Sequence, residues 1–448
     1  MLNAPLPRPP CKVLALVDSP TLATGFARVA QNLFPHWTAA GVAVEVWAIG
    51  FDGTGYGAVP WPLYPAGGGG VWASPIYLER FLQLLATGGY THCFILQDTF
   101  QFSPQFCQTL LHVCSQKQIR SLLYFPVDAP LEPAWVDIIG AVDVAVAYTG
   151  YGAAEAQKQL AARGMRVPLT VLPHGVDREI YQPHAARAEA RQMWKIVLAN
   201  GKEAVWLRPD DFCLLSVNAN QRRKDPARPL EILAALIRRG VPARLVLHCR
   251  AKTPYGCDLE AVGRQLGLEL WRDWVHSGDL FGVGDTTYMG RDARGQPLIG
   301  SSVSQLDMAR MYNAADLCLS TSLGEGWGFS FTEALACGCP VALPQHTSCG
   351  ELVTKLAAMD PAVSQHYAAR QLCPLDASDT IVLGEVDSLS RVRQRVTLPQ
   401  AADTLEQYYH SGWWRERRPL PRAAQEWLSW PRIAGEMLEL LQGPIRQP

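Results

Sequence analysis

The sequence has no uninterrupted apolar stretch that is long enough to span a bilayer. Its first residues, MLNAPLPRPPCK, contain no apolar core of signal-peptide length. From these absences we expect a cytoplasmic protein, with the proline-rich residues 1–11 as a flexible tail. An excess of one charge is absent too, because 40 Lys and Arg residues oppose 41 Asp and Glu residues. This balance argues against a protein that coats nucleic acid, although it is compatible with a local basic patch.

Metal-site and redox motifs are also missing. The 12 cysteines include no C-x-x-C pair, and Cys337 and Cys339 are separated by a single residue, which suits neither a zinc site nor a redox pair. We therefore expect free, buried thiols. No D-x-D motif stands at the end of a predicted strand, so we expect no metal site and no bound cofactor.

The first half of the chain alternates short apolar runs with helical patterns, which is typical of a doubly wound parallel sheet. A Gly-, Pro- and aromatic-rich loop at 50–75 interrupts the pattern, and a loop of this length is usually functional or mobile. The chain is expected to pass out of the first domain at residues 173–177. Strands are predicted at 13–17, 42–49, 92–97, 121–125, 142–148 and 167–172, and helices at 26–37, 76–86 and 103–115.

The alternation then restarts, so we predict a second doubly wound sheet and a cleft at the carboxyl ends of the strands. The expected domains are 12–180 and 181–410, followed by a helical segment at 411–448. Within that segment, 427–442 is amphipathic and is expected to brace the first domain; the alternative is an ordinary helix on the second. Strands are predicted at 212–217, 244–249, 275–278, 317–320 and 341–343, and helices at 229–239, 259–265, 303–314 and 331–337.

The most informative segment is 316–352, DLCLSTSLGEGWGFSFTEALACGCPVALPQHTSCGEL. After a predicted strand, glycines alternate with Glu325, Trp327 and Phe329, and a helix is predicted to start near Ser330. Glycines allow a ligand to approach the backbone closely, and a helix N-terminus offers unpaired N–H groups and a positive dipole end. The segment therefore predicts an anion site suited to a diphosphate.

Two carboxylates belong to this segment: Glu325 in the loop and Glu333 in the expected first helical turn. Both are expected to face the same cavity. Carboxylates do not bind phosphates, so we expect them to accept hydrogen bonds from the hydroxyls of a sugar and a ribose. The alternative is a glycine-rich turn without a ligand.

The segment EGWGFSFTEALACGCPV closely resembles the E-x7-E signature of glycosyltransferase family 4 and related retaining glycosyltransferases with the GT-B fold. The resemblance continues at 311–316, at the hinge-like 172–177 and at 218–224, and it covers most of 12–355. It implies an α/β architecture of two Rossmann-like domains facing across a cleft, with a C-terminal helix crossing back. It also implies a metal-independent, retaining transferase for a hexosyl or pentosyl group, with a nucleotide-diphosphate sugar such as a UDP-sugar as donor.

The resemblance implies roles for individual residues. Glu325 would contact the donor sugar, Glu333 the ribose, and Lys224 the diphosphate as the bond to the anomeric carbon breaks. Gly25 would bring its backbone to the phosphates, or it is a simple tight turn. The donor-binding set implied is Gly25, His174, Asn218, Asn220, Arg222, Gly326, Trp327, Gly328, Phe329 and Glu333, and the catalytic set is Glu325, Lys224, Asp128 and Arg223.

The sequence departs from the family at two places. Many relatives carry an arginine where this chain has Asn218 or Ala219, so Arg222 or Arg223 is expected to supply the charge; the alternative for both is a solvated surface charge. Many relatives also have a histidine at the end of a middle strand. Here the matching segment offers Asp128, as a contact to a hydroxyl group or proton acceptor, or else as a turn or cap residue.

The acceptor is not identified by any motif. Tyr56, Trp61, Tyr64 and Trp72 in the loop at 50–75 are candidates for stacking on sugars or bases, or they pack internally. The segment 413–422, WWRERRPLPR, is a candidate for nucleic acid or an anionic membrane surface, or it is a solvated face.

Two other function classes fit the pattern. One is a sugar-nucleotide epimerase or a phosphorylase on the same fold. The other is a non-catalytic nucleotide-sugar-binding protein, against which the presence of Glu325, Glu333 and Lys224 argues. Release of a nucleotide diphosphate from a donor sugar discriminates the transferase from the binding protein.

Overall fold

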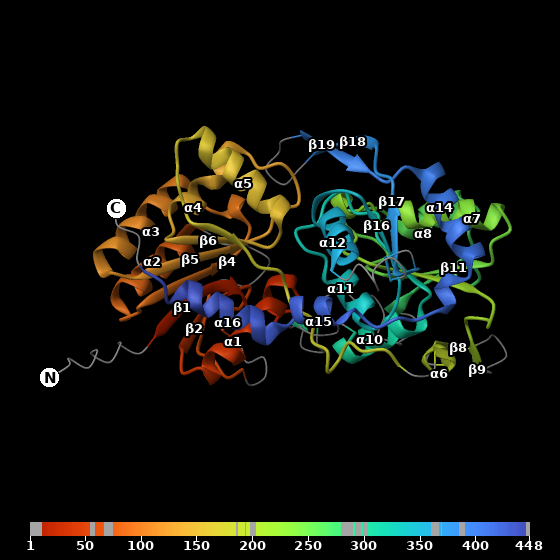
Figure 1. Cartoon of the computed structure of the whole chain (residues 1–448), viewed down its shortest axis with the longest axis horizontal. Helices are drawn as coiled ribbons and strands as arrows, with labels where there is room; N and C mark the ends of the chain where they lie inside the picture. Colours follow the sequence, from red (N-terminus) through yellow and green to blue (C-terminus); the bar gives the residue numbers. More distant parts are fainter. Residues whose placement is uncertain are drawn as a thin grey trace. The chain divides into compact units, whose positions relative to one another are not determined.

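In a computed structural model the chain divides into two units, each built on one parallel sheet (Figure 1). Unit 1 comprises Met1–Gly175 and Ser429–Pro448, and unit 2 comprises Val176–Leu428. The structure describes residues 11–53, 59–66, 75–184, 187–192, 194–197, 203–278, 290–291, 297–298, 303–359, 367–368, 370–384 and 390–444.

The sheet of unit 1 has seven parallel strands in the order β3-β2-β1-β4-β5-β6-β7. Residues 13–17 of its central strand are all completely buried, as expected for a parallel sheet that is covered on both faces. The strands are β1 (Lys12–Asp18), β2 (Ala43–Ile49), β3 (Leu63–Pro65), β4 (His92–Leu96), β5 (Arg120–Phe125), β6 (Val144–Ala147) and β7 (Leu169–Val171). All the strands predicted for this half are therefore confirmed, and the short β3 was missed.

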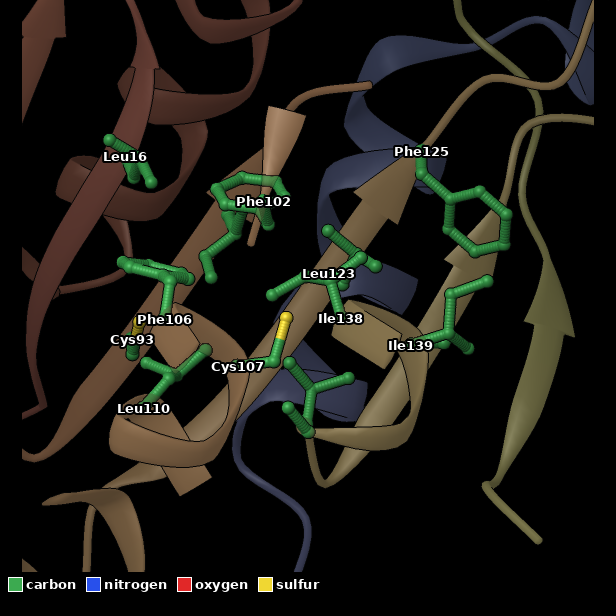
Figure 2. Packing of buried hydrophobic residues seen from close by; sticks show 14 of the residues in the cluster. Leu16, Cys93, Phe102, Phe106, Cys107, Leu110, Leu123, Phe125, Ile138 and Ile139 are labelled. Carbon is green, nitrogen blue, oxygen red and sulfur yellow. The ribbon is translucent and has the colours of Figure 1, made fainter. Parts of the chain in front are cut away.

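Helices cover both faces of this sheet. On one face, α1 (Gly25–Ala39) packs beside α16 (Trp430–Leu441), and Trp37 of α1 donates a hydrogen bond to the carbonyl of Ala434 at 3.1 Å. On the other face, α2 (Pro75–Thr87), α3 (Pro104–Lys117), α4 (Asp137–Gly140) and α5 (Gly150–Ala162) enclose the larger core. Figure 2 shows Phe106 and Leu110 of α3 pointing toward the sheet that carries Leu123. As predicted, Ser103 caps α3.

The sheet of unit 2 has six parallel strands in the order β12-β11-β10-β15-β16-β17. Its strands are β10 (Phe212–Val217), β11 (Ala243–His248), β12 (Trp274–His276), β15 (Leu317–Leu319), β16 (Val341–Pro344) and β17 (Leu372–Leu375). Its helices are α6 (Arg187–Gln192), α7 (Arg228–Arg238), α8 (Leu259–Gln265), α10 (Gln305–Ala314), α11 (Phe329–Ala336), α12 (Thr347–Ala358), α14 (Leu398–Ser411) and α15 (Arg422–Trp427). The second doubly wound sheet is thus confirmed.

Three antiparallel strand pairs accompany the sheet of unit 2. Two of them are small: β8 (Lys195–Val197) with β9 (Glu203–Val205), and β13 (Gly290–Arg291) with β14 (Pro297–Leu298). The third pair is β18 (Asp379–Gly384) with β19 (Ser390–Arg395), a hairpin that lies between β17 and α14 in the sequence.

The C-terminal helix lies where it was predicted, but the segment that returns to unit 1 begins later than expected. The helix predicted at 427–442 is present as α16, which contacts α1 and β5 of unit 1, and a separate short helix, α15, precedes it. Pro431 stands in the first turn of α16, where proline is favoured. The chain leaves unit 2 after Leu428, not at 411, because Trp414 is buried in the core of unit 2 and Arg417 donates hydrogen bonds to three carbonyls of that unit.

The same contacts remove one arginine from the candidate basic patch at 413–422, which stays a prediction. Arg417 is held by the carbonyls of Tyr312, Ala315 and Cys337, and burial lowers its pKa. Arg418 and Arg422 form ion pairs with Glu416 and Glu426. One of the four arginines of the segment, Arg417, is therefore held internally, whereas Arg422 stays exposed.

The aromatic loop candidates are also used internally where they are described. Trp61 is buried against Phe34 and donates to the hydroxyl of Thr38, and Tyr64 donates to Glu45 at 2.7 Å. Tyr56 and Trp72 lie outside the described residues.

The expected thiol chemistry is confirmed. All twelve cysteines are free, and all except Cys11 and Cys257 are buried. Burial raises the pKa of several of these thiols, Cys318 and Cys349 among them, which makes them poor nucleophiles. Among the described helices, none combines the length and the apolar character needed to cross a membrane.

Candidate functional site

Two loops of unit 2 meet at the carboxyl ends of the neighbouring strands β10 and β15. The backbone N–H of Leu323 donates to the carbonyl of Arg223 at 2.8 Å, and the hydroxyl of Thr321 donates to the carbonyl of Asp225 at 3.0 Å. These bonds join the loop after β15 to the short 3-10 turn Arg222–Lys224. In a parallel sheet this edge is the usual place for a ligand.

Lys224 and Glu325, two of the four residues predicted to be catalytic, form an ion pair. The Lys224 Nζ lies 2.5 Å from Glu325 Oε2, and the two residues are 9% and 7% exposed. A pair this buried is costly to desolvate, so each charge depends on the other for compensation. The loops therefore hold a cation and a carboxylate side by side at one point of the strand edge.

The helix that follows begins in a way that requires glycine. Gly328 is the N-cap of α11, with φ 99° and ψ 68°, and a Cβ there would lie 2.4 Å from the ring of Phe331. Gly324 and Gly326 do not have positive φ. No side chain caps α11, whereas Ser304 caps α10 and Asp258 caps α8. The Phe331 N–H donates to the Gly328 carbonyl at 3.1 Å, and the start of α11 presents the positive end of the helix dipole beside the loop.

The start of α12 fixes the loop from its other side. The hydroxyl of Thr347 accepts a hydrogen bond from the backbone N–H of Glu325 at 3.2 Å, and Ser348 donates to the carbonyl of Trp327 at 3.0 Å. The Trp327 ring packs against Trp427 with their centroids 5.8 Å apart. Along 326–330, the residues Gly326, Gly328, Phe329 and Ser330 keep partial exposure, so this stretch of backbone is the accessible part of the loop.

Glu333 is placed differently from the expectation. Because α11 begins at Phe329, Glu333 lies in its second turn and not in the first. It is 2% exposed and accepts a hydrogen bond from the hydroxyl of Tyr312 on α10 at 3.2 Å. The structure thus brings Glu325 to Lys224 and Glu333 to α10.

The predicted site residues of the Arg222–Lys224 turn and the two asparagines before it differ in how far their side chains are exposed. Arg222 is exposed, and Arg223 and Asn218 are partly buried. Asn220 is 3% exposed and donates to the carbonyls of Arg250 and Cys257 at 2.9 and 2.8 Å. Its side chain therefore fastens the neighbouring loop, which shapes the site from behind.

Three predicted residues belong to unit 1. Gly25 is exposed at the first position of α1, whose N-terminus is capped by Thr24. Asp128 is partly buried in the loop after β5. His174 is 1% exposed, its Nδ1 lies 2.8 Å from the Tyr124 hydroxyl, and burial holds its pKa well below the ordinary value. A neutral histidine in this position fastens the end of β7 to the sheet.

Sequence reasoning missed a polar cluster at the carboxyl end of β1. Asp18 is completely buried and accepts hydrogen bonds from Thr24 at 2.6 Å and from Gln97 at 2.7 Å. Burial raises the pKa of Asp18 to about 6, and the two hydrogen bonds oppose the rise. The signal was present, because a carboxylate directly after a wholly apolar central strand stands at the ligand edge of a sheet.

It also missed the arginines of β19. Arg395 donates to both oxygens of Asp225 at 2.7 and 3.1 Å, which fixes the residue that follows Lys224. Within the residues that the structure describes, no group of three or more His, Cys, Asp or Glu side chains is arranged to hold a metal ion.

Comparisons with known proteins give a family match for part of unit 2. Residues 296–372 match the family model of group 1 glycosyl transferases, and this range includes Glu325, Glu333 and the whole of α11. No protein with a curated description matches the chain by sequence.

Solved structures of low sequence identity match almost the whole chain. Sucrose-phosphate synthase from Thermosynechococcus elongatus is similar over 96% of this chain and 98% of its own, with 16% identity and a TM-score of 0.62. WaaG, a glycosyltransferase involved in lipopolysaccharide biosynthesis, covers 96% and 100%, with 14% identity and a TM-score of 0.60. The catalytic domain of starch synthase IV from Arabidopsis thaliana, bound to ADP and acarbose, covers 96% and 98%, with 10% identity and a TM-score of 0.57. The two parallel-sheet units thus have the GT-B fold of glycosyltransferases, as predicted.

Proposed function

We propose that the protein is a retaining glycosyltransferase that moves a hexosyl or pentosyl group from a nucleotide-diphosphate sugar to an acceptor hydroxyl. The observation that carries this proposal is the Lys224–Glu325 pair beside the uncapped start of α11. A cation, a set of backbone N–H groups and a carboxylate are the partners that a diphosphate and a sugar hydroxyl need. The family match over 296–372 and the ADP-bound starch synthase among the similar structures support it.

Each residue receives a role from its place. Lys224, with Arg222 and Arg223 on the same turn, would neutralise the diphosphate as it leaves, and the backbone of Trp327, Gly328 and Phe329 would bind its oxygens. Glu325 would accept a hydrogen bond from the donor sugar and Glu333 from the ribose. Gly326 and Asn218 would line the donor, while Asn220 would hold the loop behind it.

Unit 2 would therefore be the donor domain and unit 1 the acceptor domain. In unit 1, Gly25 would approach the phosphates with its backbone, and Asp128 would contact the acceptor or receive its proton. His174 would act from a buried position by holding the chain before the boundary between the units.

We propose front-face substitution as the mechanism. The leaving diphosphate oxygen would help to remove the proton from the incoming hydroxyl while the bond to the anomeric carbon breaks. The protein would contribute position and positive charge rather than a covalent nucleophile. Cationic side chains would carry the leaving-group charge, so we expect a metal-independent reaction.

A donor panel tests the proposal. UDP-, ADP-, GDP- and TDP-sugars would be incubated with the protein, with release of nucleotide diphosphate as the measurement and thermal stabilisation as the binding assay. A ligand at 100 times its Kd stabilises a protein by about 2.7 kcal/mol, which such an assay detects. Lys224→Ala should lower turnover of the active donor by about 10²–10³-fold, the usual cost of one electrostatic donor. Stabilisation without release would indicate a binding protein instead, and unchanged kinetics in Lys224→Ala would remove that lysine from the site.

A further inference from the structure

The β18–β19 hairpin presents a stripe of arginines toward the body of unit 2. In its register Arg393 pairs with Ile381 and Arg395 with Asp379, so alternate residues of β19 share one face. Arg393 is 5% exposed, whereas its neighbour Val392 is 65% exposed. The charged face is therefore the packed one, which is the reverse of an ordinary surface hairpin.

The base of the hairpin stands at the ligand edge of the sheet. It leaves directly after β17, and the Thr397 backbone N–H donates to the Asp376 carbonyl at 3.0 Å, which ties its two ends together. Figure 1 shows the hairpin at the end of unit 2 where β17 leads into it. The strands β10, β15, β16 and β17 are parallel, so the hairpin shares this edge with the loops of Lys224 and Glu325.

Contacts of the stripe confirm where it points. The bidentate bond of Arg395 to Asp225 places the strand beside the residue that follows Lys224. Arg393 lies two residues earlier on the same face, about 7 Å away along the strand. Burial and the charge of Arg393 lower the pKa of His346 to about 4, while the charge of Glu325 opposes this change. His346, the N-cap of α12, is thus within electrostatic range of both Arg393 and Glu325.

The charge balance at the loops leaves a place for this cation. Glu325 already compensates Lys224, and Asp225 already compensates Arg395. Asn218 and Ala219, at the end of β10, supply no positive charge. A nucleoside diphosphate brings at least two negative charges to the site. Of the cations proposed for it, Lys224 is in an ion pair and Arg222 is exposed, so a buried cation at this edge would add to the charge of Lys224, Arg222 and Arg223.

We infer that Arg393 is a further cation of the donor diphosphate site, in addition to Lys224, Arg222 and Arg223, and that it comes from the hairpin rather than from the loops after the sheet strands. The inference rests on the proposed function, since it assigns a residue to the diphosphate of the same donor. The hairpin then has a specific role, because Arg395 anchors it on Asp225 and Arg393 lies two residues along on the same face of β19.

The test compares Arg393→Gln with Arg310→Gln, which removes the same charge from an exposed position of α10. Titration calorimetry would measure the Kd of the nucleoside diphosphate of the active donor, and of its nucleoside monophosphate. We expect Arg393→Gln to weaken diphosphate binding roughly tenfold or more, as for the loss of a charged hydrogen bond, and monophosphate binding much less. Arg393→Lys should recover part of the loss, and Arg310→Gln should bind both ligands like the wild type.

The outcomes are distinguishable. If Arg393→Gln binds the diphosphate as tightly as the wild type does, the inference is overturned and the proposed function stays intact. The same holds if Arg393→Gln loses affinity equally for the diphosphate and the monophosphate. If Arg393→Gln does not fold, Arg393→Met removes the same charge with a side chain that suits a buried position, and a folded Arg393→Met variant with wild-type diphosphate affinity overturns the inference. A wild-type protein that binds no nucleoside diphosphate overturns both the inference and the proposed function.

Discussion

Replacing Asp18 with asparagine should make unit 1 more stable at neutral pH, by an amount that depends on pH in a defined direction. The Asp18 carboxyl is completely buried at the end of β1, and its pKa is raised from 3.8 to about 6. Between these two values the folded state holds a proton that the unfolded state has released. The stability of the wild type therefore falls as pH rises through this window, and asparagine has no such loss.

The size of the effect follows from the same values. A shift of about two pKa units corresponds to about 3 kcal/mol, of which about 2 kcal/mol develops between pH ~4.5 and ~7.5. Asparagine also fits the hydrogen bonds. Gln97 Oε1 is buried and accepts no hydrogen bond from the described residues. If the Gln97 side-chain amide flips by half a turn, its Oε1 can accept a hydrogen bond from the NH₂ group of the introduced asparagine. The Thr24 hydroxyl can still donate to the asparagine Oδ1.

Urea unfolding of both proteins across this pH range, followed by hydrogen exchange on peptides from β1 and α1, measures the free energy of unfolding of unit 1. Glu79→Gln on the exposed side of α2 controls for the removal of one carboxylate. The advantage of Asp18→Asn should grow toward neutral pH. An advantage that is constant, or that grows toward acid, would show that Asp18 stays ionised in the folded state and would refute the reasoning.

Two further predictions concern the donor loop and the chemistry. Gly328→Ala should lower the free energy of unfolding of unit 2 by roughly 1–3 kcal/mol and weaken donor binding, because φ is 99° and the new Cβ would meet the ring of Phe331. Gly326→Ala, where φ is not positive, should lower this free energy less. Equal destabilisation of the two variants in urea unfolding would contradict the argument from backbone conformation. Excess chelator should leave the initial rate of donor turnover unchanged, since cationic side chains would balance the leaving diphosphate, and a strict requirement for Mn²⁺ would count against this.

The sheets were predictable because parallel strands are buried on both faces and appear as plain apolar runs. Residues 13–17 and 212–217 show this most clearly, and both are central strands. Lys224 and Glu325 were each predicted to follow a strand of the second sheet, so their position at one edge of that sheet was predictable, but the ion pair between them was not predicted.

The hairpin was not predictable on the same grounds. In β19 the arginines alternate with valine and glutamine, a pattern that normally places arginine in solvent and valine inside. In β19 the arginine face packs and the valine face is exposed. Asp225 gives Arg395 a buried carboxylate partner on the packed face, and Val392 lies on the opposite, exposed face. The carboxylate partners of Arg395, Asp225 and Glu231, are far away in the sequence, so local patterns do not reveal that this face packs.

The buried role of Arg417 in the C-terminal segment was not predictable for a related reason. A run with four arginines and two tryptophans suggested a surface for a charged partner. The partners of Arg417 are instead three carbonyl oxygens, from Tyr312, Ala315 and Cys337. Main-chain acceptors are available anywhere in a sequence, so side-chain composition does not reveal that an arginine will be consumed by them.

The ion pair at the loop leads to a last prediction, in which affinity and turnover change in opposite directions. Glu325 both compensates Lys224 and, in the proposed mechanism, contacts the donor sugar. Glu325→Gln leaves Lys224 buried without its carboxylate, which costs the free protein up to about 3–5 kcal/mol, and a bound diphosphate would restore compensation. A nucleoside diphosphate should therefore raise the melting temperature of Glu325→Gln more than that of the wild type, while sugar transfer slows. Glu333→Gln removes the same charge from a carboxylate that contacts Tyr312, so it should not enhance diphosphate binding. Equal stabilisation of the wild type and Glu325→Gln would mean that Lys224 does not meet the diphosphate, and the role of the pair would then be structural.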